Sequence, residues 1–462
     1  MNVTERHCIK SLVMIVGWFL LFLLDQLDVN IDWILIFGVT VAICYCAYRE
    51  PNFIIRYIMV FFMAVGNLAG VFICEHSNLW LNELGVYSGY VGSFPLICAG
   101  WTIFISTVWL LDQKYPFSDE AKKNEIIKFR MGQRTILVQE GVVILSFVLS
   151  ALLLLHVIPH PAFAEHMDRF AYQAQYMSAI WRHIATTVYT GLPILIAIFI
   201  LKGTDSKFVK ILGHLGLWMY IGFLFCSGEK FGGFWYIVVL FCIIFSIKGQ
   251  NMSVRCLRSS LLKVVAIFFL LLMILLVHRS LTYDSAMAST YLPQRIAQQG
   301  QLWWATYKLD KNNNLHVDEL DDEFGTYFQF SDINDKEYNH AIYKIMRVVT
   351  PSNLFQRKIE SGSRYSTSTF ASMFYYFKIP GVFIFAVIGG LLYWGIMREF
   401  IRNIHHGNIV EILLLNKFLS IYYGIIAMSE LNIALQYKQL FYLSIYIFMV
   451  IFREYFYRKQ RD

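Results

Sequence analysis

Long apolar runs separated by short charged segments constrain this chain more than any other feature of its sequence. A helix that crosses a membrane needs roughly 20 mainly apolar residues, and about twelve runs approach that length. They lie near residues 12–27, 33–47, 54–74, 94–111, 136–157, 184–201, 211–226, 233–247, 262–277, 379–396, 410–428 and 440–452. Charged residues make up only 15% of the chain, whereas soluble domains have about 25%. The sequence therefore predicts an all-α polytopic membrane protein with about twelve transmembrane helices.

The positions of lysine and arginine predict how these helices are oriented. Alternate connections are rich in basic residues, in the segments 49–56, 114–134, 202–210, 248–258, 398–402 and 453–461. Basic residues concentrate in short cytoplasmic loops, so we expect these connections and both termini to be cytoplasmic. The first run lacks the small residues of a signal-peptide cleavage site and is expected to be a retained span. In a bacterium, this pattern predicts a multi-pass protein of the inner membrane whose other connections face the periplasm.

One polar block, residues 281–379, is far longer than any other connection between the apolar runs. It divides the chain into the earlier helices (1–280), the block itself, and the last helices with a cytoplasmic tail (380–462). A connection of this length is usually functional or a folded subdomain. We expect a mainly helical periplasmic loop that covers an active site.

Cationic side chains gather at the predicted outer ends of the spans, where basic residues are normally scarce. They are Arg169, Arg182, Lys230, Arg279 and Arg295. Arginine binds phosphate through a planar fork, and lysine binds it as a point charge. Such a set is suited to hold a diphosphate at the membrane–water interface. The alternative is that these residues are interfacial anchors or form salt bridges with Asp168 and Glu229.

A glycine-rich, charged turn at residues 226–233, Cys-Ser-Gly-Glu-Lys-Phe-Gly-Gly, joins two apolar runs. Glu229 and Lys230 lie there beside hydrocarbon, where ionised groups are costly unless they are paired or functional. The sequence leaves two interpretations open, a tight structural turn and a part of the active site.

The polar block contains a segment, residues 292–304, that combines an arginine with amides and aromatic residues. In a helix, Arg295 and Gln299 share one face because they are four residues apart, so Gln299 can hold a sugar or phosphate oxygen. Trp303 and Trp304 can stack on a sugar ring or anchor the loop at the interface. Aromatic residues are common at membrane interfaces, which favours anchoring.

An acidic, asparagine-rich stretch in the same block resembles a calcium loop of the EF-hand kind. Its oxygen ligands would be Asp310, Asn312, Asn314, Asp318 and Asp321. Such loops usually have glycine at the sixth place and glutamate at the twelfth, and here those places hold Leu315 and Asp321. A structural calcium site and a solvated acidic turn are both compatible with the stretch, and the departures favour the turn.

Other signals argue against several classes of protein. No cysteine lies in the polar block, and the cysteine spacing predicts neither a disulfide framework nor a zinc site. His156, His160, His166 and His183 lack metal-ligand spacing, and there is no Walker, GxSxG or nucleotide-binding glycine motif. The net charge of +7 comes from the orienting loops, so we expect no nucleic-acid partner.

The chain resembles the Wzy-type O-antigen polymerases, which join lipid-linked oligosaccharide repeat units. It is similar to them in its many predicted spans, its large late loop, and a Ser/Thr/Phe-rich stretch, residues 363–381, before the next span. The Gly-Glu-Lys-Phe turn at 228–231 and the Arg-Ile-Ala-Gln-Gln-Gly segment at 295–300 also resemble one branch of that family.

The resemblance implies a metal-independent glycosyltransferase of the GT-C-like superfamily that acts in the biosynthesis of lipopolysaccharide or a related surface polysaccharide. Such an enzyme transfers a growing glycan from undecaprenyl pyrophosphate to the distal sugar of a new lipid-linked repeat unit. It requires no cofactor, and its expected partners are membrane lipids, a chain-length regulator and a flippase. The reaction needs cations for the departing diphosphate and a base for the acceptor hydroxyl. Arg295 is the leading cation, and Glu229, Asp168 and His166 are candidates for the base.

Two other functions remain open on the sequence. An O-antigen ligase would use the same donor and transfer the glycan to the lipid A core. A lipid-linked oligosaccharide flippase or other transporter would be expected to have charged residues deep inside its spans. Asn67 and Glu140 are the main polar residues inside the predicted spans, which favours the polymerase over the transporter.

Overall fold

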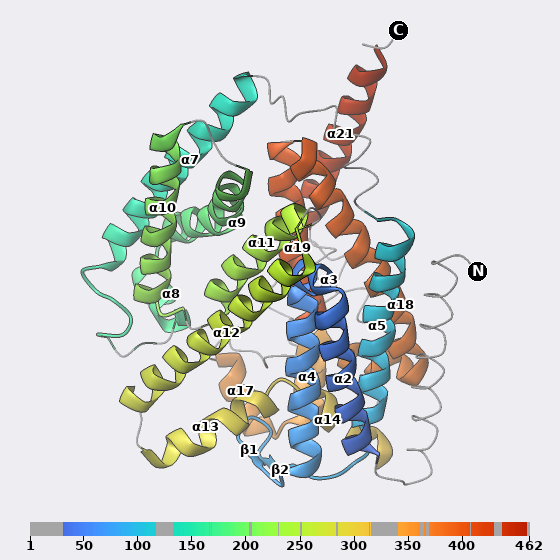
Figure 1. Cartoon of the computed structure of the whole chain (residues 1–462). Helices are drawn as coiled ribbons and strands as arrows, with labels where there is room; N and C mark the ends of the chain where they lie inside the picture. The colour runs from blue at the N-terminus through green and yellow to red at the C-terminus, as the bar shows by residue number, and fades with distance from the viewer. Residues whose placement is uncertain are drawn as a thin grey trace.

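The computed structural model describes residues 31–116, 133–165, 167, 169–202, 206–229, 231–249, 252–282, 285–313, 315, 341–360, 365, 369–406, 408–428 and 437–459. Most of this part of the chain is α-helical (Figure 1). The helices are α2 (Asp32–Arg49), α3 (Pro51–Arg56), α4 (Ile58–His76), α5 (Phe94–Lys114), α7 (Gln133–Val157), α8 (Arg169–Tyr176), α9 (Ala179–Lys202), α10 (Lys207–Cys226), α11 (Gly232–Gly249), α12 (Val254–Thr282), α13 (Ser285–Ala297), α14 (Gln301–Lys311), α16 (Ala341–Val349), α17 (Ser352–Glu360), α18 (Ala371–His406), α19 (Ile409–Met428) and α21 (Tyr437–Lys459). The strands β1 (Trp80–Leu81) and β2 (Val86–Tyr87) form one antiparallel hairpin.

Nine helices in the described residues are long and apolar enough to cross a membrane, namely α2, α4, α5, α7, α10, α11, α12, α18 and α19. The prediction of an all-α, multi-pass membrane protein is therefore confirmed. Two further predicted runs lie within α9 and α21, and α21 contains a shorter apolar helix, Gln439–Arg453. The predicted run 12–27 lies outside the described residues, so the total of about twelve spans stays a prediction.

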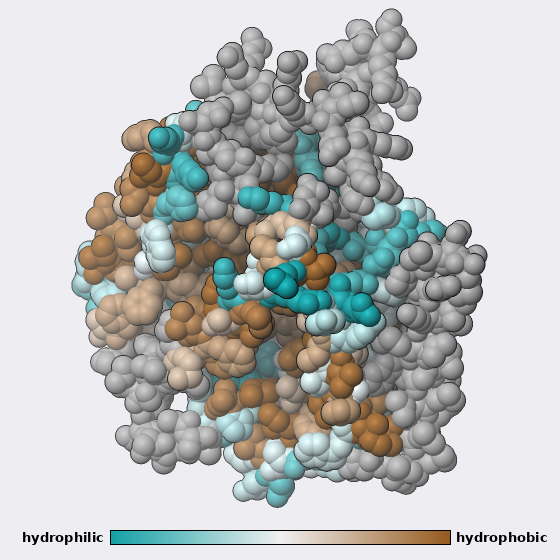
Figure 2. Space-filling view, in the orientation of Figure 1, coloured by the Kyte–Doolittle hydropathy of each residue, from teal (hydrophilic) through white to brown (hydrophobic). Residues whose placement is uncertain are grey.

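The surface of the spans is mainly hydrophobic, as expected for helices in contact with lipid. Figure 2 shows hydrophobic residues over α10 and α12 on the face in view, and Trp218 and Leu262 are among the exposed ones. Hydrophilic residues gather where α3 meets the start of α12, close to the exposed Arg255. This polar band agrees with the basic connection predicted at residues 248–258.

The described helices of the polar block lie at one end of the bundle. Figure 1 shows the β1–β2 hairpin, α13, α14 and α17 at one end of α4, and α3 at its other end. α13 and α14 pack against α4, and α14 and α16 pack against α18. Trp303, Trp304, Ile342 and Ile345 belong to the same buried cluster as the spans. The block therefore shares the main hydrophobic core of the protein, and a second cluster is formed around α7 to α10.

The two boundaries of the polar block differ slightly from the sequence prediction. α12 continues to Thr282, five residues past the predicted end of its apolar run. At the other boundary, α18 begins at Ala371 and is kinked at Lys378, which has φ 55° and ψ −147°. Pro380 lies two residues after Lys378; it has no N–H group to continue the helix and disfavours helical geometry at Ile379, so the helix is interrupted in this region. The predicted span from residue 379 therefore begins just after this kink.

Candidate functional site

The turn between α13 and α14 packs backbone to backbone against the middle of α4. A Cβ atom on Gly70 of α4 would lie 2.5 Å from the amide nitrogen of Gly300 and 2.6 Å from the carbonyl oxygen of Ile296. A Cβ atom on Gly300 would overlap the amide nitrogen of Val71. Glycine is required at both positions because only a residue without a side chain permits this approach. The Arg-Ile-Ala-Gln-Gln-Gly segment is thus a packing element.

Asn67 fixes the same turn through its side chain. The Asn67 Nδ2 atom donates to the carbonyl oxygen of Gln299 at 2.6 Å, and Trp101 Nε1 donates to Asn67 Oδ1 at 2.9 Å. Asn67 lies nine residues before the end of α4 at His76, or roughly 13 Å along the helix at 1.5 Å per residue. The polar residue noticed inside the predicted span therefore binds a deeply inserted turn of the polar block.

Arg295 lies on the last turn of α13, next to this inserted turn. Its Nε atom donates to the Tyr291 hydroxyl at 3.0 Å, and its Nη1 atom donates to Gln298 Oε1 at 2.7 Å. The guanidinium also lies 5.6 Å from the centre of the Tyr291 ring. These partners are neutral, and no ion pair of Arg295 occurs within the described residues. Within the described part of the chain, the half-buried guanidinium is thus bound by neutral groups.

Gln299 lies in the inserted turn, two residues past the end of α13 at Ala297. Its Nε2 atom lies 3.5 Å from the Arg295 carbonyl oxygen, and its own carbonyl oxygen is bound by Asn67. The backbone of Gln299 therefore holds the turn against α4.

The β1–β2 hairpin is fastened to the helices of the polar block. Asn82 Nδ2 donates to Gln294 Oε1 at 2.7 Å, one residue before Arg295. Glu83 accepts from Gln301 and forms a 2.7 Å ion pair with Lys358 of α17. Its backbone carbonyl accepts the Tyr365 hydroxyl at 2.5 Å. The connection 77–93 and the polar block therefore form one assembly around Arg295.

Trp303, predicted to stack on a sugar or to anchor the loop, is an anchor inside the protein. Its side chain is 0% exposed. Its indole Nε1 donates to the Ser93 carbonyl at 3.1 Å, and its ring packs on Phe374. The neighbouring Trp304 is also 0% exposed and donates to the Gly89 carbonyl at 2.8 Å. The interfacial anchoring expected for both residues is replaced by burial in the core, so no face of Trp303 is accessible to a sugar.

Glu229 and Arg169 form the salt bridge that was the alternative to a diphosphate clamp. Arg169 Nη1 lies 2.8 Å and 3.0 Å from the two carboxylate oxygens of Glu229. The Gly233 amide donates to Glu229 Oε1 at 3.1 Å. This centre belongs to the region where α8 meets the α10–α11 turn, whereas Arg295 lies on α13, which packs on α4. Two of the five predicted cations, Arg169 and Arg295, therefore lie on different elements, α8 and α13.

Two of the remaining predicted cations, Arg182 and Arg279, lie in described helices. Arg182 is exposed in α9, and Arg279 lies in the last turns of α12. Asp168, His166 and Lys230 lie outside the described residues. Arg295 is the predicted cation whose contacts with the polar block the structure describes.

Two of the predicted calcium ligands lie at the end of α14. Asp310 Oδ1 forms a 2.5 Å ion pair with Lys378 Nζ at the α18 kink, and Asn312 is the C-cap residue of α14. Asn314, Asp318 and Asp321 lie outside the described residues. Among the residues that were placed, no group of three acidic, histidine or cysteine side chains is arranged to hold a metal ion. Asp310 thus links the polar block to the start of the following span.

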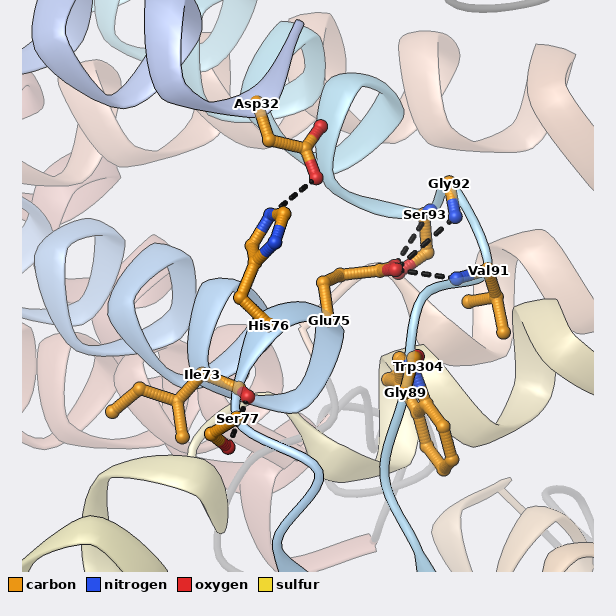
Figure 3. Close-up of polar contacts among 10 residues, drawn as sticks. All are labelled: Asp32, Ile73, Glu75, His76, Ser77, Gly89, Val91, Gly92, Ser93 and Trp304. Atoms are coloured by element: carbon orange, nitrogen blue, oxygen red, sulfur yellow. Dashed lines mark hydrogen bonds and ion pairs between the residues drawn. The ribbon is translucent and has the colours of Figure 1, made fainter. Parts of the chain in front are cut away.

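Glu75, at the end of α4, is a buried carboxylate that sequence reasoning missed. It accepts the amides of Val91 at 2.5 Å, Gly92 at 3.1 Å and Ser93 at 2.8 Å, and the Ser93 hydroxyl at 2.5 Å (Figure 3). These amides lie just before α5, where the helix dipole also favours a negative charge. An acidic residue at the end of an apolar run was the only signal for it in the sequence.

His76 and Asp32 form a second pair at the same end of α4. His76 Nε2 lies 2.9 Å from Asp32 Oδ2, which joins α4 to the start of α2 (Figure 3). The His76 ring packs against Trp33, Phe72 and Tyr90. Phe72 and His76 share one face of α4, whereas Gly70 and Cys74 face α13. The pair therefore lies on a different face of the helix from the inserted turn.

Comparison with known proteins adds one finding. Residues 335–443 match a family of unknown function (DUF6418). The match includes α16 to α19, and it begins after Arg295 and the inserted turn. No curated protein and no solved structure matches the chain.

Proposed function

We propose that the protein polymerises oligosaccharide repeat units linked to undecaprenyl pyrophosphate, at the periplasmic face of a bacterial inner membrane. The observation that carries this proposal is the placement of Arg295. Its guanidinium has neutral partners in the described structure, Tyr291 and Gln298, and lies beside a turn that is inserted against a membrane helix. A lipid diphosphate at the membrane surface needs a cation in such a place.

In the proposed reaction, the hydroxyl of the acceptor sugar attacks the anomeric carbon of the donor glycan. The new glycosidic bond forms while the bond from that carbon to the pyrophosphate oxygen breaks, and the acceptor proton passes to a base. Negative charge develops on the leaving pyrophosphate, and a preorganised guanidinium stabilises that charge. The donor already carries its leaving group, so the proposed reaction needs no nucleotide, and the resemblance implies that it needs no metal.

The contacts of Glu229 favour a structural role for this residue over that of a base. Both of its carboxylate oxygens are held by Arg169, and one of them also accepts the Gly233 amide. A proton acceptor there would have to leave its ion pair before reacting. We therefore assign Glu229 and Arg169 to holding α8 against the α10–α11 turn.

Replacement of Arg295 tests the proposal. Loss of a transition-state donor in a site shielded from water costs about 2.7–4 kcal/mol, or roughly a hundred- to thousandfold in rate. Arg295→Ala should therefore reduce the ladder of surface polysaccharide to single repeat units. Arg295→Lys should recover only part of the ladder, because lysine lacks the two-pronged fork. The matched control is Arg357→Ala, which removes an exposed arginine of α17 in the same block.

The shape of the ladder also separates the polymerase from a ligase. A polymerase defect leaves single repeats attached to the lipid A core, whereas a ligase defect removes all repeats from the core. A full wild-type ladder from well-expressed Arg295→Ala protein would refute the assignment of Arg295. Loss of every core-linked repeat in a deletion strain would favour the ligase.

The proposed orientation is tested by labelling cysteines with an impermeant maleimide in intact cells. Asn78→Cys, in the exposed part of the connection 77–93, should be labelled in a variant without other cysteines. Cys256, exposed near the start of α12, should react only after the membrane is opened. The opposite pattern would show that the polar block faces the cytoplasm.

A further inference from the structure

The β1–β2 hairpin presents two aromatic side chains on its outward face. Trp80 and Tyr87 are directly opposite each other in the two strands, with ring centres 4.9 Å apart. Side chains alternate between the two faces of a strand, so Leu81 points inward and is only 2% exposed. Trp80 is 42% and Tyr87 61% exposed. The hairpin thus exposes flat apolar rings on an element that is otherwise anchored to the core.

The aromatic pair is held in a fixed position relative to Arg295. The hairpin turn contains Asn82 and Glu83, which bind Gln294 of α13 and Lys358 of α17. Leu84 is fully buried beneath the turn. Because Gln294 precedes Arg295 in the same helix, the rings and the guanidinium belong to one rigid assembly.

The chemistry of the hairpin favours a sugar over an anionic lipid headgroup. Residues 77–93 contain no lysine or arginine, which a surface for anionic lipids would need. Exposed amide side chains, Asn78 and Asn82, precede and follow Trp80. Aromatic faces with amides beside them provide apolar contact for the C–H face of a sugar ring and hydrogen bonds for its hydroxyls.

We propose that Trp80 and Tyr87 form a glycan-binding platform, on which sugar rings of the lipid-linked chain stack while its diphosphate lies at Arg295. The identity of the bound glycan in this inference rests on the proposed function. The platform is the sugar-stacking subsite that the buried Trp303 does not provide. The platform holds the glycan between successive additions, so its loss shortens the chains that are made.

Binding of lipid-free glycan to the full-length protein tests the platform. The protein is placed in nanodiscs of phosphatidylcholine, and the probe is the polysaccharide released by mild acid from the surface of the source cells. Trp80→Leu keeps an apolar side chain but removes the flat ring face on which the sugar stacks, and it should weaken binding roughly tenfold. Trp80→Phe should bind nearly as well as the wild type. Trp218→Leu, at an exposed tryptophan of α10, is the matched control and should not change binding.

Wild-type glycan binding by Trp80→Leu would overturn the proposal. The competing role, an anchor in the lipid interface, is tested with a bimane fluorophore on Tyr87→Cys in nanodiscs that contain brominated phosphatidylcholine. Strong quenching by the bromine atoms would show that the hairpin lies in lipid and would also overturn the platform. Absence of quenching, together with the loss of binding in Trp80→Leu, is the expected result.

The experiments can refute the glycan-binding platform and the polymerase function independently of each other. Arg295→Ala should leave the binding of lipid-free glycan unchanged, because that probe has no diphosphate, but it should abolish the ladder. Trp80→Leu should still polymerise and give a ladder of shorter modal length. If Arg295→Ala makes a normal ladder while Trp80→Leu loses glycan binding, the assignment of Arg295 fails and the platform stands.

Discussion

Replacement of Glu75 should loosen the connection between the β1–β2 hairpin and α5. The Glu75 carboxylate accepts three consecutive backbone amides and one hydroxyl, and the residue is only 2% exposed. Glu75→Ala removes the acceptor of all four donors at once. The Ser93 hydroxyl can rotate to another acceptor, but the three amides are fixed by the backbone.

The expected loss is about 3 kcal/mol. A buried donor left without a partner costs about 1–3 kcal/mol, and a hydrogen bond to a charged group contributes about 1.5–3 kcal/mol. Water entering the vacated space can satisfy some of the amides, which keeps the total near the lower end of the sum. Glu75→Gln retains an oxygen acceptor but turns an NH₂ group toward one donor, so its cost should be about half as large. Ser93→Ala, which leaves the three amides bound, should cost about 1 kcal/mol.

Hydrogen–deuterium exchange measures this effect where it occurs. A decrease of about 3 kcal/mol in the free energy of local opening corresponds to roughly a hundredfold faster exchange. Peptides that contain Val91, Gly92 and Ser93 should show this increase in purified Glu75→Ala protein, with a smaller increase in Ser93→Ala. Unchanged exchange at these amides in Glu75→Ala, with an unchanged melting temperature, would refute the reasoning.

Three further results are expected. Gly300→Ala should destabilise the protein by several kcal/mol, because its Cβ atom meets the α4 backbone, whereas Gly395→Ala, inside α18, has open space and should not lower the melting temperature. Lys378→Gly should raise the melting temperature, because relief of the strained backbone at φ 55°, worth about 1–3 kcal/mol, exceeds the loss of the half-buried ion pair with Asp310, worth about 1 kcal/mol. A lower melting temperature would contradict this. Burial raises the pKa of Tyr172 to about 12. The protonated phenol therefore stabilises the fold fully below pH 10, and this stabilisation is lost as the pH rises toward 12. Tyr172→Phe should reduce the loss of stability at alkaline pH, and an equal loss in both proteins would contradict this prediction.

The sequence was sufficient to predict the fold class, because hydropathy and charge act over short stretches of chain. An apolar run of span length must become a helix in lipid, since its backbone groups have no other partners there. The kink at Lys378 lies two residues before Pro380, so a local feature of the sequence accounts for its position. Even the salt bridge of Arg169 with Glu229 was one of two interpretations open at the sequence level, because both residues lie at predicted outer ends.

The candidate site depended on contacts between residues far apart in the chain. Asn67 binds Gln299 across 232 positions, and no local pattern indicates that a polar residue inside a span will hold a turn of the polar block. Trp303 is of a residue type that is common in interfacial anchors, yet it is buried. Trp80, in contrast, is exposed on a hairpin. Hydropathy cannot separate two tryptophans whose burial is set by the segments that cover them. Packing of the polar block on α4 therefore decided which aromatic rings and which arginine are accessible, because exposure is a property of the assembled surface.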